Sequence, residues 1–318
     1  MMIASKLTEV IHQHGNITDI HVTPGKPILV RSPGGYTAFD DEIVTNLDID
    51  QFAANPSVVG KGWKYRVFSR GGKLSGAVNL TTSRVRFTLF GSGKDKHEIS
   101  IFLRVIRGEP LPIEALDYPS VFQEFAEQEA GLVLITGPAG SGKTTTLSAL
   151  IDHINRHRTC RIYTVEEPIE YVHKSKTAFV VQREIGPTTR SFGDGVQHTL
   201  LEDPDVIAVG VIPDRETAAA LLNAAKSGRA VFAIVPGGCC NDALERLLGF
   251  FNGAEREERR QSLAFCLTGV ICQSLAPSPD KKSWVLSSEV LANKRDVQQI
   301  IPGATLSTFQ ATYPSFPA

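Results

Sequence analysis

The sequence predicts an α/β protein in two parts: a small α+β part on an antiparallel sheet, then a larger part on a parallel sheet. Residues 84–89 alternate between polar and apolar side chains, which is typical of a strand with one solvated face. Beyond a proline-containing connector at 107–112, short continuous apolar runs replace this alternation. Such runs are typical of strands that are buried on both faces.

The first part begins with an amphipathic helical pattern. Leu7, Val10 and Ile11 recur at helical spacing, and Gly15 can close the helix. Glycines at 34–35, 71–72 and 91–93 supply turns between the strand-like segments that follow. The predicted strands are Asp19–Val22, Ile28–Arg31, Tyr65–Ser69, Arg84–Phe90 and Glu98–Val105.

The second part alternates strands with helices. Since 318 residues exceed what one hydrophobic core usually supports, we place a domain boundary in the connector and predict domains at 1–108 and 109–318. A helix is expected around residues 147–154, where apolar side chains recur at helical spacing. The predicted buried strands are Leu132–Ile135, Ile162–Val165, Val206–Val209 and Val231–Val235.

Composition excludes several classes of protein. The net charge is −1 and no long basic run occurs, so we expect no nucleic-acid partner; the clusters at 94–96, 174–176 and 281–282 are interpreted as solvated faces. No apolar run has the roughly 18 residues of a membrane helix. The five cysteines lack zinc-site spacing, and Cys266 and Cys272 are assigned to an apolar helix. These features predict a cytoplasmic protein, peripheral to the inner membrane at most through partners.

Residues 137–144 read GPAGSGKT and match the phosphate-binding pattern G-x-x-x-x-G-K-[ST] at every fixed position. The predicted strand 132–135 leads into this segment, and a helical pattern follows it. Backbone N–H groups of such a loop can surround an anion, and the helix directs its positive end there. The predicted nucleotide-binding residues are Gly137, Pro138, Ala139, Gly140, Ser141, Gly142, Lys143, Thr144 and Thr145.

The chemistry of this loop assigns roles to single side chains. Lys143 is expected to neutralise the β- and γ-phosphates of ATP or ADP, and the Thr144 hydroxyl to bind Mg²⁺. Glu166, at the carboxyl end of the predicted strand 162–165, can hold Mg²⁺ through water or act as a base. An ordinary glycine-rich turn is the alternative for the loop.

Several segments together resemble the type II/IV secretion ATPase family, especially the pilus retraction ATPases of the PilT type. Residues 131–156 read GLVLITGPAGSGKTTTLSALIDHINR around the phosphate loop. Residues 164–173 (TVEEPIEYVH) look like the acidic box of the family, and residues 201–210 (LEDPDVIAVG) like its Walker B strand. Residues 18–31 resemble the start of its N-terminal domain. The resemblance covers nearly the whole chain.

The resemblance implies a PAS-like N-terminal domain and a RecA-like P-loop ATPase domain. It also implies a homo- or hetero-hexameric ring that acts with an inner-membrane platform protein of a pilus or secretion system. In the family, arginines of the N-terminal domain help to neutralise the phosphates. Arg86 and Arg104 match those positions, and a surface role is the alternative for each.

The sequence departs from the family at residues tied to hydrolysis. The Walker B strand of the family ends in Gly-Glu, whereas Gly210 is followed by Val211. Pro236 stands where the histidine box has its histidine, and Leu201 replaces an arginine. The late helix motif is reduced to RDVQQII at 295–301.

These changes predict that the phosphates and the metal are held while water activation is impaired. Loss of a positioned base typically lowers a rate by roughly 10²–10⁴-fold, and the Val211 side chain cannot accept a proton. The first hypothesis is therefore an ATP-binding ring subunit with impaired hydrolysis. The second is an active motor for pilus retraction or type IVB secretion that uses Glu166 as its base. A P-loop small-molecule kinase is a third class, which no acceptor-site signature supports.

Overall fold

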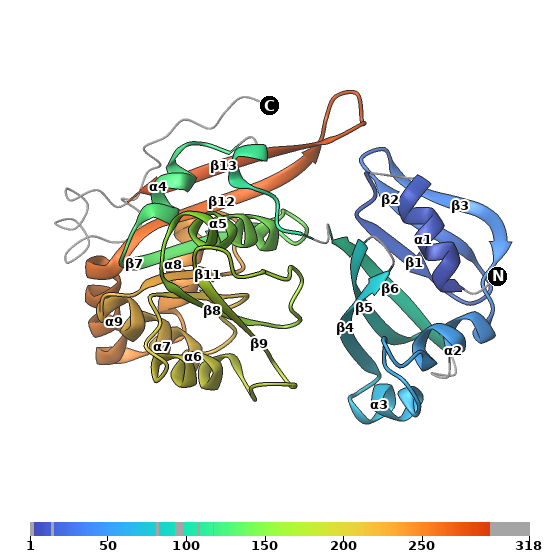
Figure 1. Cartoon of the computed structure of the whole chain (residues 1–318), viewed down its shortest axis with the longest axis horizontal. Helices are drawn as coiled ribbons and strands as arrows, with labels where there is room; N and C mark the ends of the chain where they lie inside the picture. The colour runs from blue at the N-terminus through green and yellow to red at the C-terminus, as the bar shows by residue number, and fades with distance from the viewer. Residues whose placement is uncertain are drawn as a thin grey trace. The chain divides into compact units, whose positions relative to one another are not determined.

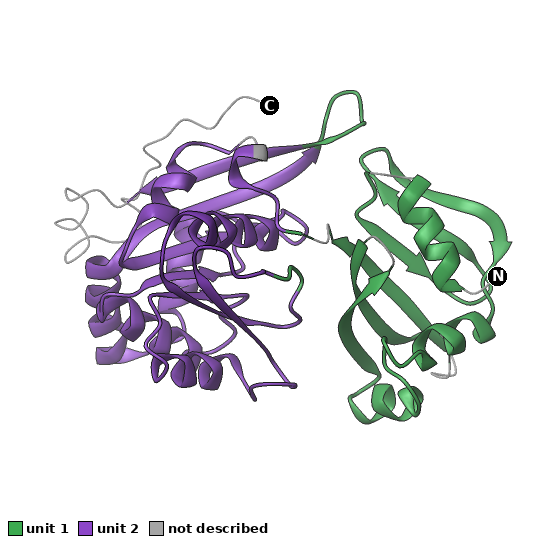
Figure 2. Cartoon of the chain, viewed as in Figure 1, with its two compact units in different colours: residues 1–109, 170–172, 277–284 green, residues 110–169, 173–276, 285–318 purple. Residues whose placement is uncertain are grey.

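The structure is a computed structural model that describes residues 3–13, 16–80, 83–92, 98–106, 109–116 and 118–292 (Figure 1). The chain divides into two compact units (Figure 2). Unit 1 comprises residues 1–109, 170–172 and 277–284, and unit 2 comprises the remainder. The predicted boundary between 108 and 109 falls at a residue outside the described ranges, so it stays a prediction.

Unit 1 is a six-stranded sheet with helices, and the strand order is β3-β2-β1-β6-β5-β4. Its strand pairs are antiparallel. The strands are β1 (Asp19–Val22), β2 (Pro27–Ser32), β3 (Gly35–Ile43), β4 (Lys73–Leu80), β5 (Ser83–Ser92) and β6 (Glu98–Ile106). The helices are α1 (Ile3–Gln13), α2 (Asn46–Ala54) and α3 (Trp63–Ser69).

The antiparallel sheet confirms the α+β prediction for this part of the chain. Val85, Phe87 and Leu89 of β5 are buried in the core of unit 1, as the alternation predicts. Leu7 and Val10 of α1 are completely buried against the same core. One face of the sheet is therefore apolar and covered by helices, and the other carries polar side chains.

One predicted strand in unit 1 is wrong. Tyr65–Ser69 lies in helix α3, whose Trp63 and Val67 are buried while Tyr65 is 79% exposed. Trp63 and Val67 are four residues apart and therefore share one helical face. A short run of aromatic and β-branched residues is ambiguous between strand and helix. The sequence also gave no prediction for β3, α2 and β4.

Unit 2 is a seven-stranded sheet in the order β13-β12-β7-β11-β10-β8-β9. Its strands are β7 (Gly131–Thr136), β8 (Arg161–Glu166), β9 (Phe179–Glu184), β10 (Val206–Val209), β11 (Ala230–Ile234), β12 (Leu267–Pro277) and β13 (Trp284–Ala292). Its helices are the 3₁₀ helix η1 (Ile113–Ala115) and α4 (Val121–Glu127), α5 (Lys143–His157), α6 (Phe192–Leu200), α7 (Arg215–Lys226), α8 (Cys240–Leu248) and α9 (Gly253–Cys266).

The five neighbouring strand pairs from β12 to β9 are parallel, which confirms the parallel α/β prediction. Each face of this sheet has its own apolar core. Helices α4 and α5 cover one face, and helices α6 to α9 cover the other (Figure 1). Because both faces are covered, β7, β8, β10 and β11 are almost continuously buried.

The end of unit 2 differs in part from the prediction. Cys266 ends helix α9, but Cys272 lies in strand β12 and not in a helix. Val270 and Ile271 are fully buried, and a short buried apolar run does not distinguish helix from strand. Gly15, Gly93, the cluster 94–96 and the segment 295–301 lie outside the described residues.

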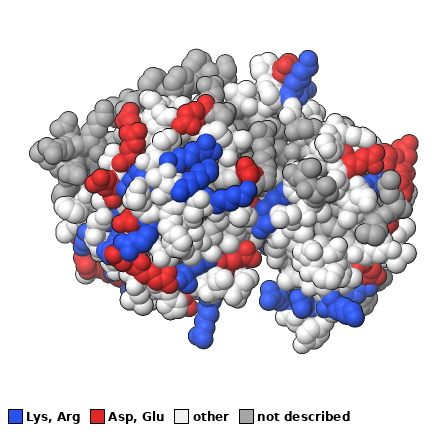
Figure 3. Space-filling view, in the orientation of Figure 1, with Lys and Arg blue, Asp and Glu red and all other residues white. Residues whose placement is uncertain are grey.

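Acidic and basic side chains are interspersed over the face of unit 2 that Figure 3 shows. Helix α9 carries alternating acidic and basic side chains at 255–260. Its Arg256 is paired with Glu245 of α8, and its Glu255 with Arg215 of α7. None of the helices in the described part of the chain has the length and apolar composition that a bilayer crossing needs.

Candidate nucleotide-binding site

The loop of residues 137–144, which we call the phosphate loop, joins the end of β7 to the start of α5 in unit 2. Three of its glycines have a positive φ, with values of 143° at Gly137, 78° at Gly140 and 85° at Gly142. L-residues with a side chain rarely adopt these conformations. The backbone therefore follows a path that only the glycine pattern allows, and α5 begins directly behind it.

Packing imposes a second constraint at Gly137. A Cβ added there would lie 2.1 Å from the Gln273 carbonyl oxygen and 2.8 Å from Ser141 Oγ. The loop is therefore wound tightly against strand β12. Pro138, Ala139 and Gly140 form its exposed tip, whereas Ser141 is 2% exposed.

Lys143 crosses the mouth of the phosphate loop. Its Nζ donates hydrogen bonds to the carbonyl oxygens of Gly137, at 2.9 Å, and of Pro138, at 2.7 Å. The ammonium group therefore lies at the loop itself, beside the positive end of α5. One cation, a helix N-terminus and a glycine-formed backbone turn together suit a polyphosphate.

The structure brings the two predicted metal-binding residues together. Thr144, in the first turn of α5, and Glu166, at the end of β8, line one small pocket with Ser148, Thr164 and His173. Glu166 is 9% exposed. A hydroxyl and a carboxylate suit Mg²⁺, which usually takes few protein ligands and completes its shell with water and phosphate oxygens. Among the described residues no group of three or more His, Cys, Asp or Glu side chains suits a metal ion.

Two side chains hold the Glu166 carboxylate in place. Thr164 Oγ1 donates to Glu166 Oε1 at 2.6 Å, and Gln182 Nε2 of β9 donates to the same oxygen at 3.0 Å. Gln182 Oε1 in turn accepts the backbone N–H of His173 at 2.8 Å. Thr164 opens the acidic box at 164–173, but no role was predicted for it, and Gln182 lies outside the recognised motifs.

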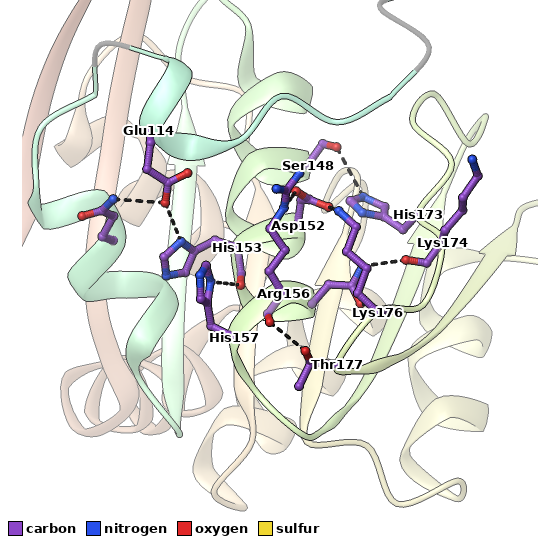
Figure 4. Close-up of polar contacts among 12 residues, drawn as sticks. Glu114, Ser148, Asp152, His153, Arg156, His157, His173, Lys174, Lys176 and Thr177 are labelled. Atoms are coloured by element: carbon purple, nitrogen blue, oxygen red, sulfur yellow. Dashed lines mark hydrogen bonds and ion pairs between the residues drawn. The ribbon is translucent and has the colours of Figure 1, made fainter.

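His173 and the acidic side chain of Asp152 line the polar side of α5 (Figure 4). Ser148 Oγ and His173 Nε2 are 3.3 Å apart, and burial lowers the pKa of His173 to about 4. Asp152 is 1% exposed and accepts from Arg156 and from Lys176. These contacts attach the segment that contains His173 and Lys176 to the helix behind the phosphate loop.

The two histidines of α5, His153 and His157, differ in their exposure (Figure 4). The His153 side chain is only 11% exposed, and its Nδ1 lies 3.2 Å from Glu114 Oε1. The rings of His153 and His157 are 4.4 Å apart, and only His157 is exposed. Helix η1 covers the first ring, which local sequence does not reveal.

The segment that replaces the histidine box packs directly against the phosphate loop. Gly237 forms an isolated antiparallel bridge with Gly137. A Cβ on Gly237 would lie 2.7 Å from Thr136 Oγ1. Cys272 Sγ donates to the Gly238 carbonyl oxygen at 3.3 Å, and burial raises the pKa of Cys272 to about 11, which keeps the thiol protonated. Residues 236–238 thus follow a closely packed path without a side chain that can contact a phosphate as histidine can.

Three other acidic residues near the Walker B strand are engaged in contacts of their own. Asp203 and Asp205 precede β10 and are paired with Arg161. They therefore lie at the amino end of the strands, opposite the phosphate loop. Asp214 Oδ1 caps α7 by accepting from Thr217 N at 2.8 Å. None of these three carboxylates is placed to substitute for the missing glutamate at Val211.

In unit 1, Arg86 of β5 and Arg104 of β6 are directly opposite each other across the antiparallel pair. Cross-strand neighbours point to the same face, so the two guanidinium groups share the polar face of this sheet. Arg104 Nε donates to Asp19 Oδ1 at 3.0 Å. Asp19 is 2% exposed and also lies 3.4 Å from Arg31 Nη1. That these arginines meet a nucleotide stays a prediction.

Comparison with known proteins identifies a family and several proteins that are similar to this chain. The model of a family described as "Type II/IV secretion system protein" matches residues 97–306. A twitching motility protein of Neisseria gonorrhoeae is 39% identical over 219 residues, which cover 69% of this chain and 58% of that protein. The type IV pilus retraction ATPase PilT of Pseudomonas aeruginosa is 37% identical over 190 residues, which cover 60% of this chain and 55% of that protein. The matches thus span little more than half of these relatives.

Solved structures are similar over most of the chain. A crystal structure of the pilus retraction motor PilT with bound ADP has a TM-score of 0.81 and 32% identity, and the match covers 95% of this chain and 86% of that one. The Legionella pneumophila ATPase DotB has a TM-score of 0.80 and 26% identity, with 93% and 83% covered. Both the fold and the sequence therefore agree with these ATPases.

Proposed function

The chain belongs to the family of type II/IV secretion system proteins, and from this premise we propose that it binds ATP or ADP with Mg²⁺ at the phosphate loop and hydrolyses ATP poorly. The observation that carries the proposal is the loop itself. Lys143 lies across the Gly137 and Pro138 carbonyl oxygens at the N-terminus of α5. The solved structure of PilT with bound ADP supports a nucleotide as the ligand.

The donor set assigns a role to each residue. Backbone N–H groups of residues 137–144 would surround the phosphates, and Lys143 would neutralise their charge. Thr144 and Glu166 would hold Mg²⁺, which supplies charge neutralisation between the phosphate oxygens. Arg86 and Arg104 of unit 1 would contribute further positive charge.

Impaired hydrolysis follows from the residues around Glu166. The side chains of Val211 and Pro236 offer neither a proton acceptor nor a hydrogen-bond donor to water, and the acidic groups at 203, 205 and 214 are engaged elsewhere. The active-motor alternative requires Glu166 to act as the base that activates water. Its carboxylate shares a pocket with Thr144. Its two bonds to Thr164 and Gln182 favour a fixed, metal-holding carboxylate over a mobile base.

We further propose that the chain is a ring-forming subunit of a pilus retraction or secretion machine, in a homo- or hetero-hexamer, and that it contacts an inner-membrane platform protein. The similarity to a pilus retraction motor supports this proposal. In a hetero-hexamer, an active paralogue would supply hydrolysis. Light scattering coupled to gel filtration, with ATP–Mg²⁺ and with or without such a paralogue, tests ring formation directly.

Two assays on purified protein test binding and hydrolysis separately. A ligand at 100 times its Kd stabilises a protein by about 2.7 kcal/mol, so ATP–Mg²⁺ should raise Tm by several degrees. Lys143→Ala should lose this shift, and Lys26→Ala, at an exposed lysine of unit 1, should retain it. Phosphate release by the unmodified protein should match the Lys143→Ala background. Lysine-dependent turnover on the order of 1 s⁻¹ or more would instead establish the active motor.

A further inference from the structure

We propose that Gln273 is a positioning residue for nucleotide binding, because its carboxamide aims the Gly142 N–H group into the phosphate loop. The inference rests on the proposed role of residues 137–144 as a phosphate site and goes beyond it. Gln273 belongs to β12, far from the loop in sequence and next to β7 in the sheet. No sequence motif marks it.

Both ends of the Gln273 side chain are bound to the phosphate loop and its helix. Nε2 donates to the Ser141 carbonyl oxygen at 2.6 Å, and Oε1 accepts from Thr146 Oγ1 at 2.7 Å. Gln273 is 1% exposed and Thr146 is completely buried. Since a carbonyl oxygen can only accept, the NH₂ group must face Ser141, and this fixes the orientation of the amide.

The hydrogen bond from Gln273 to the Ser141 carbonyl oxygen also determines where the Gly142 N–H group points. A peptide bond is planar, and in the trans form the C=O of one residue and the N–H of the next point in opposite directions. The Ser141–Gly142 peptide is not the cis bond of the described chain, which joins Glu167 to Pro168. Because Gln273 holds the Ser141 oxygen toward β12, the Gly142 N–H points away from β12, toward the inside of the loop.

Gln273 also contacts the other end of the loop through its backbone. A Cβ on Gly137 would lie 2.1 Å from the Gln273 carbonyl oxygen, and a Cβ on Gly142 would lie 3.2 Å from Gln273 Nε2. One residue of β12 therefore limits the path of the loop at both its first and its last glycine. The loop shape that an anion requires is set in part from the neighbouring strand.

The hydrogen-bond chain extends to the segment before β7. Tyr118 Oη and Thr146 Oγ1 are 2.7 Å apart. Since the Thr146 hydroxyl donates its hydrogen to Gln273, Tyr118 is the donor in this pair. The Tyr118 ring packs against Phe122 of α4, with centroids 4.7 Å apart. The carboxamide of Gln273 is thereby kept in one position before any ligand arrives.

The test compares ATP affinity in variants that alter one end of the carboxamide or both. Gln273→Met has a similar length and loses both bonds. Gln273→Glu keeps the acceptor for Thr146 but places a carboxylate oxygen against the Ser141 carbonyl. Gln261→Met, at an exposed position of α9, is the matched control. Kd is measured with a fluorescent ATP analogue and Mg²⁺, and by competition with inorganic pyrophosphate, well below the melting temperature of each variant.

We expect both Gln273 variants to raise the Kd of ATP and of pyrophosphate by about tenfold, with Glu at least as severe as Met, and the control to leave both values unchanged. A merely structural glutamine would lower the melting temperature of the nucleotide-free protein and leave both Kd values as they were. That result would overturn the inference.

Thr146→Val decides the question if the Gln273 variants do not fold. It removes the donor to Gln273 Oε1 and the acceptor for Tyr118 but leaves the bond from Gln273 to Ser141, so we expect about a threefold rise in Kd, with Thr146→Ser closer to the unmodified protein. Equal affinity for Thr146→Val and Thr146→Ser would contradict the inference. Failure of the unmodified protein to bind ATP would instead refute the proposed function, so the two failures are distinguishable.

Discussion

Glu166 lies directly against Gly210: a Cβ on Gly210 would lie 3.5 Å from the Glu166 Cα and 3.7 Å from its Cγ. The next residue, Val211, stands where the family carries its water-activating glutamate. The chain therefore retains a carboxylate beside the position from which the other is missing. A metal-holding role and a water-activating role for Glu166 predict different effects of its substitution.

The first prediction concerns Glu166→Gln. The variant keeps the size of the side chain and an oxygen that can accept from Thr164 and Gln182, but it removes the negative charge that attracts Mg²⁺. We expect Mg²⁺ to improve ATP affinity about tenfold less in the variant than in the unmodified protein, or about 1.4 kcal/mol less. Kd values with Mg²⁺ and with EDTA measure this difference.

Glu167→Gln is the matched control, since Glu167 is the next residue and is exposed. It should retain the full effect of Mg²⁺. The same Mg²⁺ effect in Glu166→Gln as in this control would show that Glu166 does not hold the metal. If the unmodified protein releases phosphate, loss of that release in Glu166→Gln alone would favour the active-motor alternative.

The second prediction is that Val211→Glu alone restores little hydrolysis. The segment 236–238 lacks the histidine of the family, and its backbone is packed against the phosphate loop through the Gly137–Gly237 bridge. We expect phosphate release to rise less than about tenfold, because one base contributes roughly 10²–10⁴-fold only when water and phosphates are already positioned. Steady-state phosphate release, with Lys143→Ala as the background, measures it.

A second substitution tests why the histidine box cannot simply be restored. Gly237→Thr places a Cβ 2.7 Å from Thr136 Oγ1, so neighbouring groups must move. Overpacking of this kind typically costs about 1–3 kcal/mol. Gly228→Thr is not a suitable control because Gly228 has a φ of 85°; Gly34→Thr, where the nearest heavy atom would be 3.5 Å away, is suitable. Equal stability of both variants, measured by urea denaturation, would show that the segment tolerates side chains.

The phosphate loop could be predicted from sequence because its constraints are local. The glycines, Lys143 and Thr144 are adjacent, and the strand before them and the helix after them are short, strong patterns. Gln273 could not be predicted, because it contacts Thr146 from 127 residues away. The only hint in the sequence is that Gln273 directly follows the apolar run at 270–272. Helix α3 was mistaken for a strand because its burial depends on the rest of unit 1.

The third prediction concerns the buried carboxylate of Asp152. Its side chain is 2% exposed and is bound to Arg156 Nε at 2.5 Å and to Lys176 Nζ at 2.6 Å (Figure 4). Asp152→Ala should lower the free energy of unfolding by about 2–4 kcal/mol, because both charge-assisted bonds and the attachment of Lys176 to α5 are lost. Asp152→Asn keeps the volume and should cost less.

Glu245→Ala is the control for Asp152→Ala. It removes an exposed ion pair with Arg256, in which both side chains are nearly half exposed, and such pairs contribute at most about 1 kcal/mol. Denaturant unfolding compares the two. If Asp152→Ala and Glu245→Ala lower the free energy of unfolding equally, the buried ion pairs of Asp152 stabilise the protein no more than an exposed pair does.

The fourth prediction concerns pH and His173. Burial lowers the pKa of His173 in the folded protein to about 4 from 6.5, while the charge of Asp152 raises it and that of Lys176 lowers it. The folded state therefore favours the neutral imidazole, and the unfolded state binds a proton first as the pH falls. The contribution of His173 to stability is fully present above pH 6.5 and is lost progressively between pH 6.5 and about 4.

The size of this effect follows from the shift, since one pKa unit corresponds to about 1.4 kcal/mol. The free energy of unfolding should fall by about 3 kcal/mol through His173 alone between pH 7 and pH 4. In His173→Asn this part of the pH dependence should disappear, whereas His157→Asn, at an exposed position of the same helix region, should keep it. Urea denaturation of all three proteins across this range isolates the histidine, because other titrating groups cancel in the difference. Parallel curves for His173→Asn and the unmodified protein would mean that the imidazole is hydrated in the folded state, since only a desolvated ring resists protonation.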